Sequence, residues 1–237
     1  RLSRPVSRVS CRCRPTSVPV TASRSWTSRG VAGWRASASE VVTRIVQAEK
    51  RGIDTVWSTS GGVSSDTLSA FAVAASRTEK VVLGTSIVPT YPRHPFVMAS
   101  EALAIEDFAP GRLRLGVGPS HRPTIEGSFG IPMGRPLAHL REYVTILRAL
   151  LWDGSVEFDG TYFTVNASIP ASVPPPKTPL PISTLRPNAW RLAGEISDGA
   201  ISWLNPIDYV IEVAKPAMQD GANAAGRPCP PAIVHVP

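Results

Sequence analysis

The segment RLRLGVGPSHRP, residues 112–123, brings together residue types that could bind a ligand or move a proton. Gly116-Val117-Gly118 could be the first glycines of a Gly-x-Gly-x-x-Gly nucleotide-binding loop. The third glycine position holds His121, however, and Pro119 lacks the N–H group that such a loop points at phosphate. We therefore predict a loop that presents Ser120 and His121 to a ligand. The imidazole could donate a hydrogen bond or relay a proton, and a histidine that only caps or stacks at the loop is an equal alternative.

Three further stretches carry small polar or cationic residues at the C-terminal ends of predicted strands, where parallel α/β proteins place their ligand-binding loops. They are Ser58-Thr59-Ser60-Gly61-Gly62, Thr85-Ser86-Ile87 and Leu185-Arg186-Pro187-Asn188. Small hydroxyl residues and glycines let a ring or a phosphate approach the backbone closely, and the Arg186 cation could pair with phosphate. A flexible turn at 58–62 and an ordinary buried strand at 85–87 are the alternatives.

The elements that must position these residues alternate strictly between strand and helix. Apolar runs predict strands at 53–59, 80–88, 112–118, 180–185, 199–204 and 231–237. Helical periodicity predicts helices at 39–52, 65–78, 94–109, 135–154, 187–197 and 206–226. Ser39 is the predicted N-cap of the first helix, and Pro216 interrupts the last. Asp159-Gly160 predicts a hairpin within 155–166, followed by a proline-rich connection at 169–179.

This alternation predicts an α/β protein with parallel strands. We favour a (β/α)8 TIM barrel over a doubly wound sheet, with the first strand and the last β/α unit lacking. The predicted domains are an atypical, disordered Arg/Ser-rich segment at 1–38 and a truncated barrel at 39–237. The first segment could be a transit-type sequence, a basic nucleic-acid-binding arm or an accidental extension.

The net charge of +7 resides in the N-terminal segment. Residues 1–39 contain eight arginines and no acidic residue, which leaves 17 basic and 18 acidic residues elsewhere, a formal charge of −1. The body therefore gives no electrostatic reason to expect a nucleic acid or a membrane as a partner. No apolar run reaches the roughly 20 residues of a membrane span, and three cysteines are too few for a disulfide framework. We expect a cytoplasmic protein with reduced thiols.

Four stretches of the body also carry a resemblance to a known family: AEKRGIDTVW at 48–57, the run at 83–132 that includes RHP and GRLRLGVG, RPLAHLREYVTILRALLWDGSVEFDG at 135–160, and RLAGEISDGAISW at 191–203. Each is weak alone, but their combination resembles the luciferase-like monooxygenase superfamily, most closely its coenzyme F420-dependent oxidoreductase branch. The resemblance covers roughly residues 40–236. It implies a (β/α)8 barrel of the bacterial-luciferase type that binds a flavin or deazaflavin at its C-terminal mouth.

The function implied by this resemblance is hydride transfer between coenzyme F420 and a small organic substrate. An FMN-dependent luciferase-like monooxygenase and a degenerate, non-catalytic barrel fragment are the alternatives. Chemistry carried by a cofactor agrees with the sequence, from which no Ser-His-Asp triad, carboxylate pair or metal site can be assembled. Members of the family commonly dimerise, which implies a homodimer.

The resemblance also assigns site residues. F420-dependent relatives place a non-prolyl cis peptide at a strand end behind the ring, which points to Ser86–Ile87. His121 is the catalytic candidate, with Glu126 as a weaker second, and Arg93 could meet an anionic cofactor tail. Arg186-Pro187 replaces a Gly-Pro pair that is usual in close relatives. The cofactor-binding candidates are Ser58, Thr85, Ser86, Ile87, Gly118, Pro119, Ser120, His121, Arg186, Pro187 and Asn188.

Overall fold

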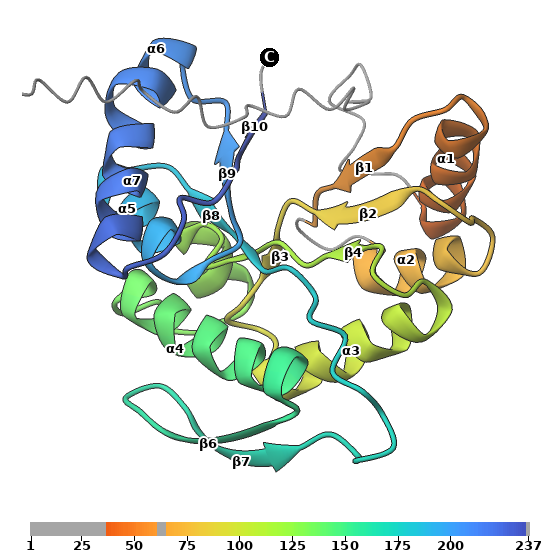
Figure 1. Ribbon diagram of the computed structural model, residues 1–237, viewed down its shortest axis with the longest axis horizontal. Coiled ribbons are helices and arrows are strands. Elements are labelled where there is room, and N and C mark those ends of the chain that lie inside the picture. Colours follow the sequence, from red (N-terminus) through yellow and green to blue (C-terminus); the bar gives the residue numbers. More distant parts are fainter. Residues whose placement is uncertain (1–36, 61–64, 236–237) are drawn as a thin grey trace, which may run out of the picture.

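The computed structural model describes residues 37–60 and 65–235. Its parallel strands form an arc in chain order, with helices on the outside (Figure 1). The strands are β1 Thr55–Ser58, β2 Val82–Thr85, β3 Val88–Pro89, β4 Leu113–Arg114, β5 Val117–Gly118, β8 Pro181–Thr184, β9 Gly199–Trp203 and β10 Ala232–His235. The predicted α/β architecture is confirmed. Within the described residues β1 and β10 do not pair, so the predicted barrel is not closed there.

Two of the predicted strands are each divided into two pieces. The run 80–88 gives β2 and β3, and the run 112–118 gives β4 and β5. β2 pairs with β1 and β4, whereas β3 pairs with β5, which pairs with β8. The alternation therefore holds along the whole arc, and the C-terminal ends of all these strands point to the same side, as expected of parallel strands.

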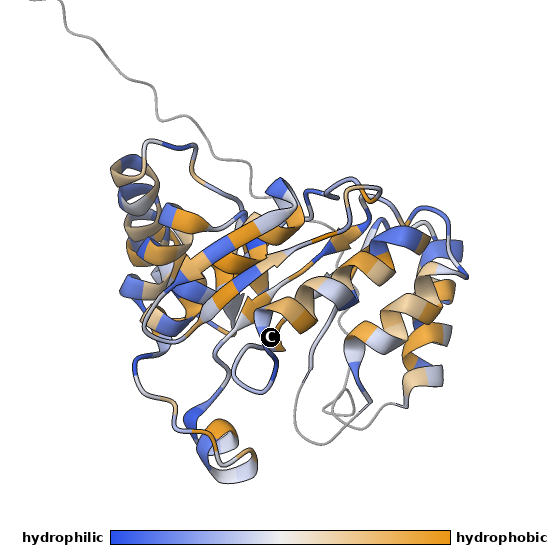
Figure 2. Cartoon of the chain, turned by 90° about the horizontal axis from the view of Figure 1, so that it is seen from below, coloured by the Kyte–Doolittle hydropathy of each residue, from blue (hydrophilic) through white to orange (hydrophobic). Residues whose placement is uncertain are grey.

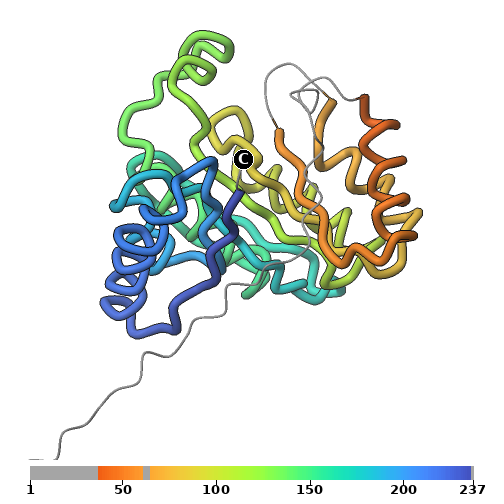
Figure 3. Tube along the Cα trace, turned by 90° about the horizontal axis from the view of Figure 1, so that it is seen from above, coloured from red at the N-terminus to blue at the C-terminus, as the bar shows by residue number. Residues whose placement is uncertain are grey.

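The helices and the hairpin also follow the prediction closely. The helices are α1 Ala38–Lys50, α2 Thr67–Ala75, α3 Pro95–Phe108, α4 Pro136–Arg148, α5 Pro187–Ile196, α6 Ile207–Tyr209 and α7 Lys215–Ala224, with π-helical turns η2 Pro123–Ser128, η3 Ala149–Asp153 and η4 Val210–Ala214. β6 Ser155–Asp159 and β7 Thr164–Ser168 form the antiparallel hairpin. α1 and α2 lie at one end of the arc, and α5 and α7 lie at the other (Figure 3).

One predicted boundary is wrong. The N-cap of α1 is Ser37 rather than Ser39, because Ser37 and Glu40 form a reciprocal capping box, so the helix begins before the predicted domain boundary. The predicted interruption at Pro216 agrees with the structure, because the α-helical pattern changes to the π-helical turn η4 just before Pro216, which stands in the first turn of α7. The predicted disorder of 1–38 concerns residues of which 1–36 lie outside the described part of the chain.

Hydrophobic side chains on the strands and on the inner faces of the helices form one core (Figure 2). Several glycines make its close approaches possible. An added Cβ on Gly116 would lie 2.0 Å from the carbonyl oxygen of Thr85, and one on Gly118 would lie 2.1 Å from the Ser183 Oγ. Packing inside the arc therefore requires both glycines of the Gly116-Val117-Gly118 motif. Their presence is explained by these contacts and does not require a bound phosphate.

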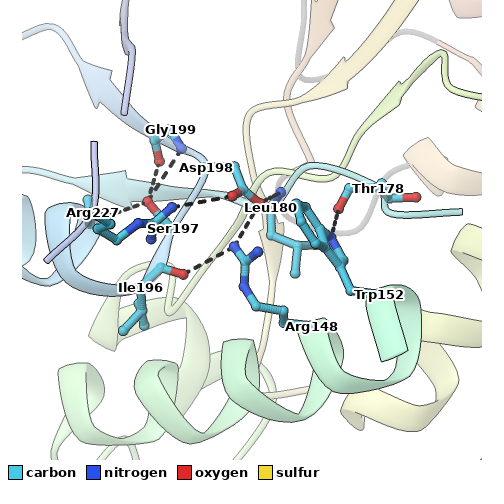
Figure 4. A network of polar contacts seen from close by, with 10 residues as sticks. Arg148, Trp152, Thr178, Leu180, Ile196, Ser197, Asp198, Gly199 and Arg227 are labelled. Atoms are coloured by element: carbon cyan, nitrogen blue, oxygen red, sulfur yellow. Dashed lines mark hydrogen bonds and ion pairs between the residues drawn. The ribbon is translucent and has the colours of Figure 1, made fainter. Parts of the chain in front are cut away.

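A polar network fixes the N-terminal ends of β8 and β9 (Figure 4). The Asp198 Oδ2 accepts hydrogen bonds of 2.8 Å from the Leu180 backbone N–H and from the Arg148 guanidinium. Arg148 also donates to the Ile196 carbonyl oxygen and lies over the Trp152 ring. Because Asp198 is mostly buried and its Oδ1 lies 3.6 Å from the Arg227 guanidinium, we interpret the network as structural.

Among the described helices, not one combines the length and the hydropathy that crossing a membrane requires.

Candidate active site

A cavity of about 140 Å³, partly open to solvent, lies at the C-terminal ends of the strands. This volume is smaller than the roughly 300–1,000 Å³ of complete small-molecule and cofactor sites, so a cofactor would occupy the cavity and also extend through its open side. Seven of its twelve lining residues carry a hydroxyl group, and four are apolar. They are Thr59, Ser60, Ser86, Ile87, Ser120, His121, Thr124, Ser183, Thr184, Leu185, Ile201 and Trp203. Neutral hydroxyls beside apolar side chains suit an aromatic ligand with polar edges.

Four predicted residues meet at this cavity. Ser86 and Ile87 reach it from the end of β2, and Ser120 and His121 reach it from the end of β5. The Ser86–Ile87 peptide bond is cis, as the resemblance predicts. Ser120 has a φ of 63°, an uncommon conformation for a residue with a side chain. This turn leads from β5 to His121, whose carbonyl oxygen accepts the first hydrogen bonds of η2.

Other predicted candidates lie next to the cavity without lining it. The Thr85 Oγ1 donates to the Gly116 carbonyl oxygen at 2.8 Å, so its hydroxyl is used inside the wall. Ser58 ends β1 beside the lining residues Thr59 and Ser60, while Gly61 and Gly62 lie outside the described residues. Gly118 and Pro119 directly precede Ser120, and Gly118 allows Ser183 to come close.

The predicted stretch Arg186-Pro187-Asn188 forms the start of α5. All three residues are exposed, and Leu185, which precedes them, lines the cavity. Arg186 is the N-cap residue but makes no side-chain capping hydrogen bond. The positive end of the helix and a cation therefore lie together at the cavity mouth, which is a favourable place for an anion.

Two predicted charged candidates are engaged elsewhere. The Arg93 guanidinium pairs with Asp66 at 2.8 Å and with Glu101 at 3.3 Å, so it holds α2 and α3 together rather than lining the cavity. Glu126 pairs with Arg122 within η2 and accepts a hydrogen bond from the Met133 backbone N–H. This residue stabilises the loop between β5 and α4, which projects from the body (Figure 3), and it does not line the cavity.

An aromatic cluster anchors the far end of that projecting loop. The Tyr91 hydroxyl donates to the Met133 carbonyl oxygen, and the Tyr91 ring stacks on His139 with 3.9 Å between centroids. Burial lowers the pKa of His139 to about 4 and raises that of Tyr91 to about 12, so both groups are neutral near pH 7. The loop that carries Ser120 and His121 is thus held at both ends.

The sequence interpretation missed five lining residues, Thr124, Ser183, Thr184, Ile201 and Trp203. It also missed His235 at the end of β10, whose Nε2 lies 2.7 Å from the Ser86 Oγ. Polar residues near the ends of strands 180–185, 199–204 and 231–237 were the available signal. Alternation along β8 and β9 could have identified Ser183 and Ile201, which pair directly.

Comparisons with known proteins agree with this architecture. Residues 18–236 match the family model described as luciferase-like monooxygenase. The F420-dependent glucose-6-phosphate dehydrogenase of Beutenbergia cavernae is 34% identical over 214 residues, which are 82% of this chain and 63% of that protein. The chain spans between 56% and 64% of the length of the curated relatives it matches.

Solved structures show the same fold. The coenzyme F420-dependent tetrahydromethanopterin reductase of Methanopyrus kandleri superposes with a TM-score of 0.70 at 26% identity, covering 81% of this chain and 61% of that one. An F420-dependent secondary alcohol dehydrogenase solved with an F420-acetone adduct gives a TM-score of 0.75 at 23% identity, covering 85% and 67%. The strand order, the loop geometry and the family match lead to one conclusion: the chain belongs to the luciferase-like monooxygenase family.

Proposed function

We propose that this chain forms the cofactor-binding part of an oxidoreductase that transfers a hydride between coenzyme F420 and a small organic substrate. The observation that carries the proposal is the meeting of Ser86, Ile87, Ser120 and His121 at one cavity in a member of this family. Relatives whose names include F420 dependence support F420 over FMN. The described arc is, in this proposal, part of a (β/α)8 barrel, and the protein acts as a homodimer.

The residues present fit a deazaflavin in chemistry. The cavity supplies an apolar side chain, Ile87, and several hydroxyls able to donate to or accept from the polar edges of a heterocycle. Arg186 and the N-terminus of α5, with Pro187 and Asn188, stand where an anionic tail could leave the cavity. We assign Ser58, Thr85, Gly118 and Pro119 to the support of the lining residues, because they precede or brace them.

The bound cofactor would supply the hydride acceptor or donor. The protein would position the cofactor and substrate, exclude water and provide a path for a proton. Ile87 and Ile201 would exclude water from the inner part of the cavity. Ser120 and Ser86 orient ligand groups through their hydroxyls. His121 is exposed at the edge of the cavity and can exchange protons with solvent, so it gives a proton to, or takes one from, a ligand oxygen or nitrogen.

The test is a titration of the purified protein with oxidised F420 and, separately, with FMN, followed by quenching of cofactor fluorescence. Saturable binding of F420 but not of FMN is the expected result. Saturable binding of FMN alone would assign the FMN-dependent alternative, and binding of neither would leave a non-catalytic barrel fragment. Leu185→Glu, which places a negative charge beside the proposed position of the anionic tail, should weaken binding, whereas Ile211→Glu on the exposed side of η4 should not.

A further inference from the structure

His235 is a buried imidazole directly behind the cavity wall. It ends β10, where it pairs in register with Trp203 of β9, and only 9% of the residue is exposed. Its carbonyl oxygen accepts a hydrogen bond from the Leu204 backbone N–H at 3.2 Å, which fixes the strand end. The sheet therefore fixes the backbone position from which the His235 ring projects.

The ring contacts two residues that line the cavity. Its Nε2 lies 2.7 Å from the Ser86 Oγ, and its centroid lies 5.4 Å from that of the Trp203 ring at 50°. Ser86 is 149 positions away in the sequence and reaches the contact from the opposite part of the arc. From β10, His235 thus contacts Ser86 at the end of β2 and Trp203 at the end of β9, although it is not itself in the cavity lining.

The contact controls what the Ser86 hydroxyl can offer to a ligand. A hydroxyl has one proton and two acceptor lone pairs, and a neutral imidazole has one donor and one acceptor nitrogen. Burial lowers the pKa of His235, which favours the neutral ring. If Ser86 donates, its proton is held on Nε2 and the hydroxyl offers only acceptor lone pairs to the cavity; if the ring donates, one lone pair is used and the hydroxyl proton is free for a ligand. In either case the bond decides which hydrogen-bonding role Ser86 offers to the cavity.

We propose that His235 is a positioning residue that orients the Ser86 hydroxyl, and supports the Trp203 ring, against the ligand in the cavity. The proposal rests on the proposed function for the identity of that ligand, oxidised F420. Its geometric basis, a short buried hydrogen bond onto a lining residue, is independent of the cofactor. His235 acts through Ser86, because His235 is not among the residues that line the cavity.

Five proteins are titrated with oxidised F420: wild type, His235→Phe, His235→Gln, Ser86→Ala and the double variant His235→Phe/Ser86→Ala. His235→Phe keeps a ring against Trp203 but removes the hydrogen bond, so we expect the Kd to rise about tenfold, as for one lost hydrogen bond. His235→Gln retains an amide nitrogen that can reach Ser86, and its Kd should stay within about threefold of wild type. In His235→Phe/Ser86→Ala the two losses should not add, because they break the same contact.

A measurement on the ligand-free protein separates this inference from the proposed function. In protein with 15N-labelled histidine, Ser86→Ala should shift the ring nitrogen resonances of His235 and leave those of His139 unchanged. An unchanged His235 spectrum, a wild-type Kd in His235→Phe, or additive losses in the double variant would each overturn the positioning role. Failure of the wild type to bind F420 overturns the proposed function and with it the ligand named here. Thermal unfolding of each variant confirms that affinity is compared between folded proteins.

Discussion

Gly116→Ala tests whether the Gly-x-Gly pair serves packing inside the arc. The new Cβ would lie 2.0 Å from the Thr85 carbonyl oxygen and 2.6 Å from the Ile201 Cδ1. Because Cβ contacts to backbone oxygen below about 3 Å do not occur, the chain at Gly116, between β4 and β5, must move about 1 Å away from Thr85 at the end of β2. The carbonyl oxygen of Gly116 also accepts hydrogen bonds from the Thr85 hydroxyl and the Val88 N–H, which such a shift would weaken.

The expected loss is about 3 kcal/mol in the free energy of unfolding, at the upper end of overpacking effects because a backbone atom cannot rotate away. Gly118→Ala should lose less, about 1–2 kcal/mol, because the Ser183 hydroxyl that it meets at 2.1 Å can change rotamer, and the contact of 2.8 Å with the Ser183 Cβ requires a smaller shift than the backbone contact of Gly116→Ala. Gly127→Ala is the matched control, since its Cβ would meet nothing within 4 Å, and it should change stability by less than about 1 kcal/mol.

Urea unfolding followed by circular dichroism measures these three losses. The packing argument requires the order Gly116→Ala, then Gly118→Ala, then Gly127→Ala, from most to least destabilised. Equal midpoints for Gly116→Ala and Gly127→Ala would refute it. If Gly116→Ala yields no folded protein, the comparison of the other two variants still decides, because both should fold.

Three further predictions concern other parts of the molecule. Asp198→Ala removes hydrogen bonds from Arg148 and a backbone N–H, and urea unfolding should show a loss of about 3 kcal/mol, against less than about 0.5 kcal/mol for the exposed Asp220→Ala. Ser120→Gly places a glycine at a φ of 63° and should raise the free energy of unfolding by about 0.5 kcal/mol, seen as a slightly higher melting temperature. The same variant should weaken F420 binding in a titration. Burial lowers the pKa of His139 from 6.5 to about 4, so as the pH is lowered the unfolded chain binds the proton before the folded protein does. The free energy of unfolding should therefore decrease as the pH is lowered from 6.5 to about 4. His139→Gln should flatten that part of the dependence of stability on pH.

The order of the elements could be predicted from the sequence because each depends on local signals. Strand runs, helical periodicity and Pro or Gly at element ends are encoded within a few residues of one another. The same is true of the loop after β5: Pro119 and His121 exclude a nucleotide cradle without knowledge of the tertiary structure. The cis peptide at Ser86–Ile87 could be predicted only from the family resemblance, because no local sequence signal indicates it.

Contacts across the arc could not be predicted, because nothing local in the sequence specifies them. Ser86 and His235 are joined by a hydrogen bond over 149 positions, and His235 alone resembles any buried strand residue. Arg93 was predicted to be available to an anion, but Asp66 and Glu101 come from two other elements and neutralise it. The Ser37 cap was missed for the opposite reason, since Ser39 is an equally good local candidate.

The most direct test of the central claim is a crystal structure of the protein grown with oxidised F420. The proposed function predicts density for the heterocycle inside the cavity, in contact with Ser86 and Ile87 on one side and within reach of Ser120 and His121. An ordered F420 bound elsewhere, with this cavity filled only by water, would contradict it.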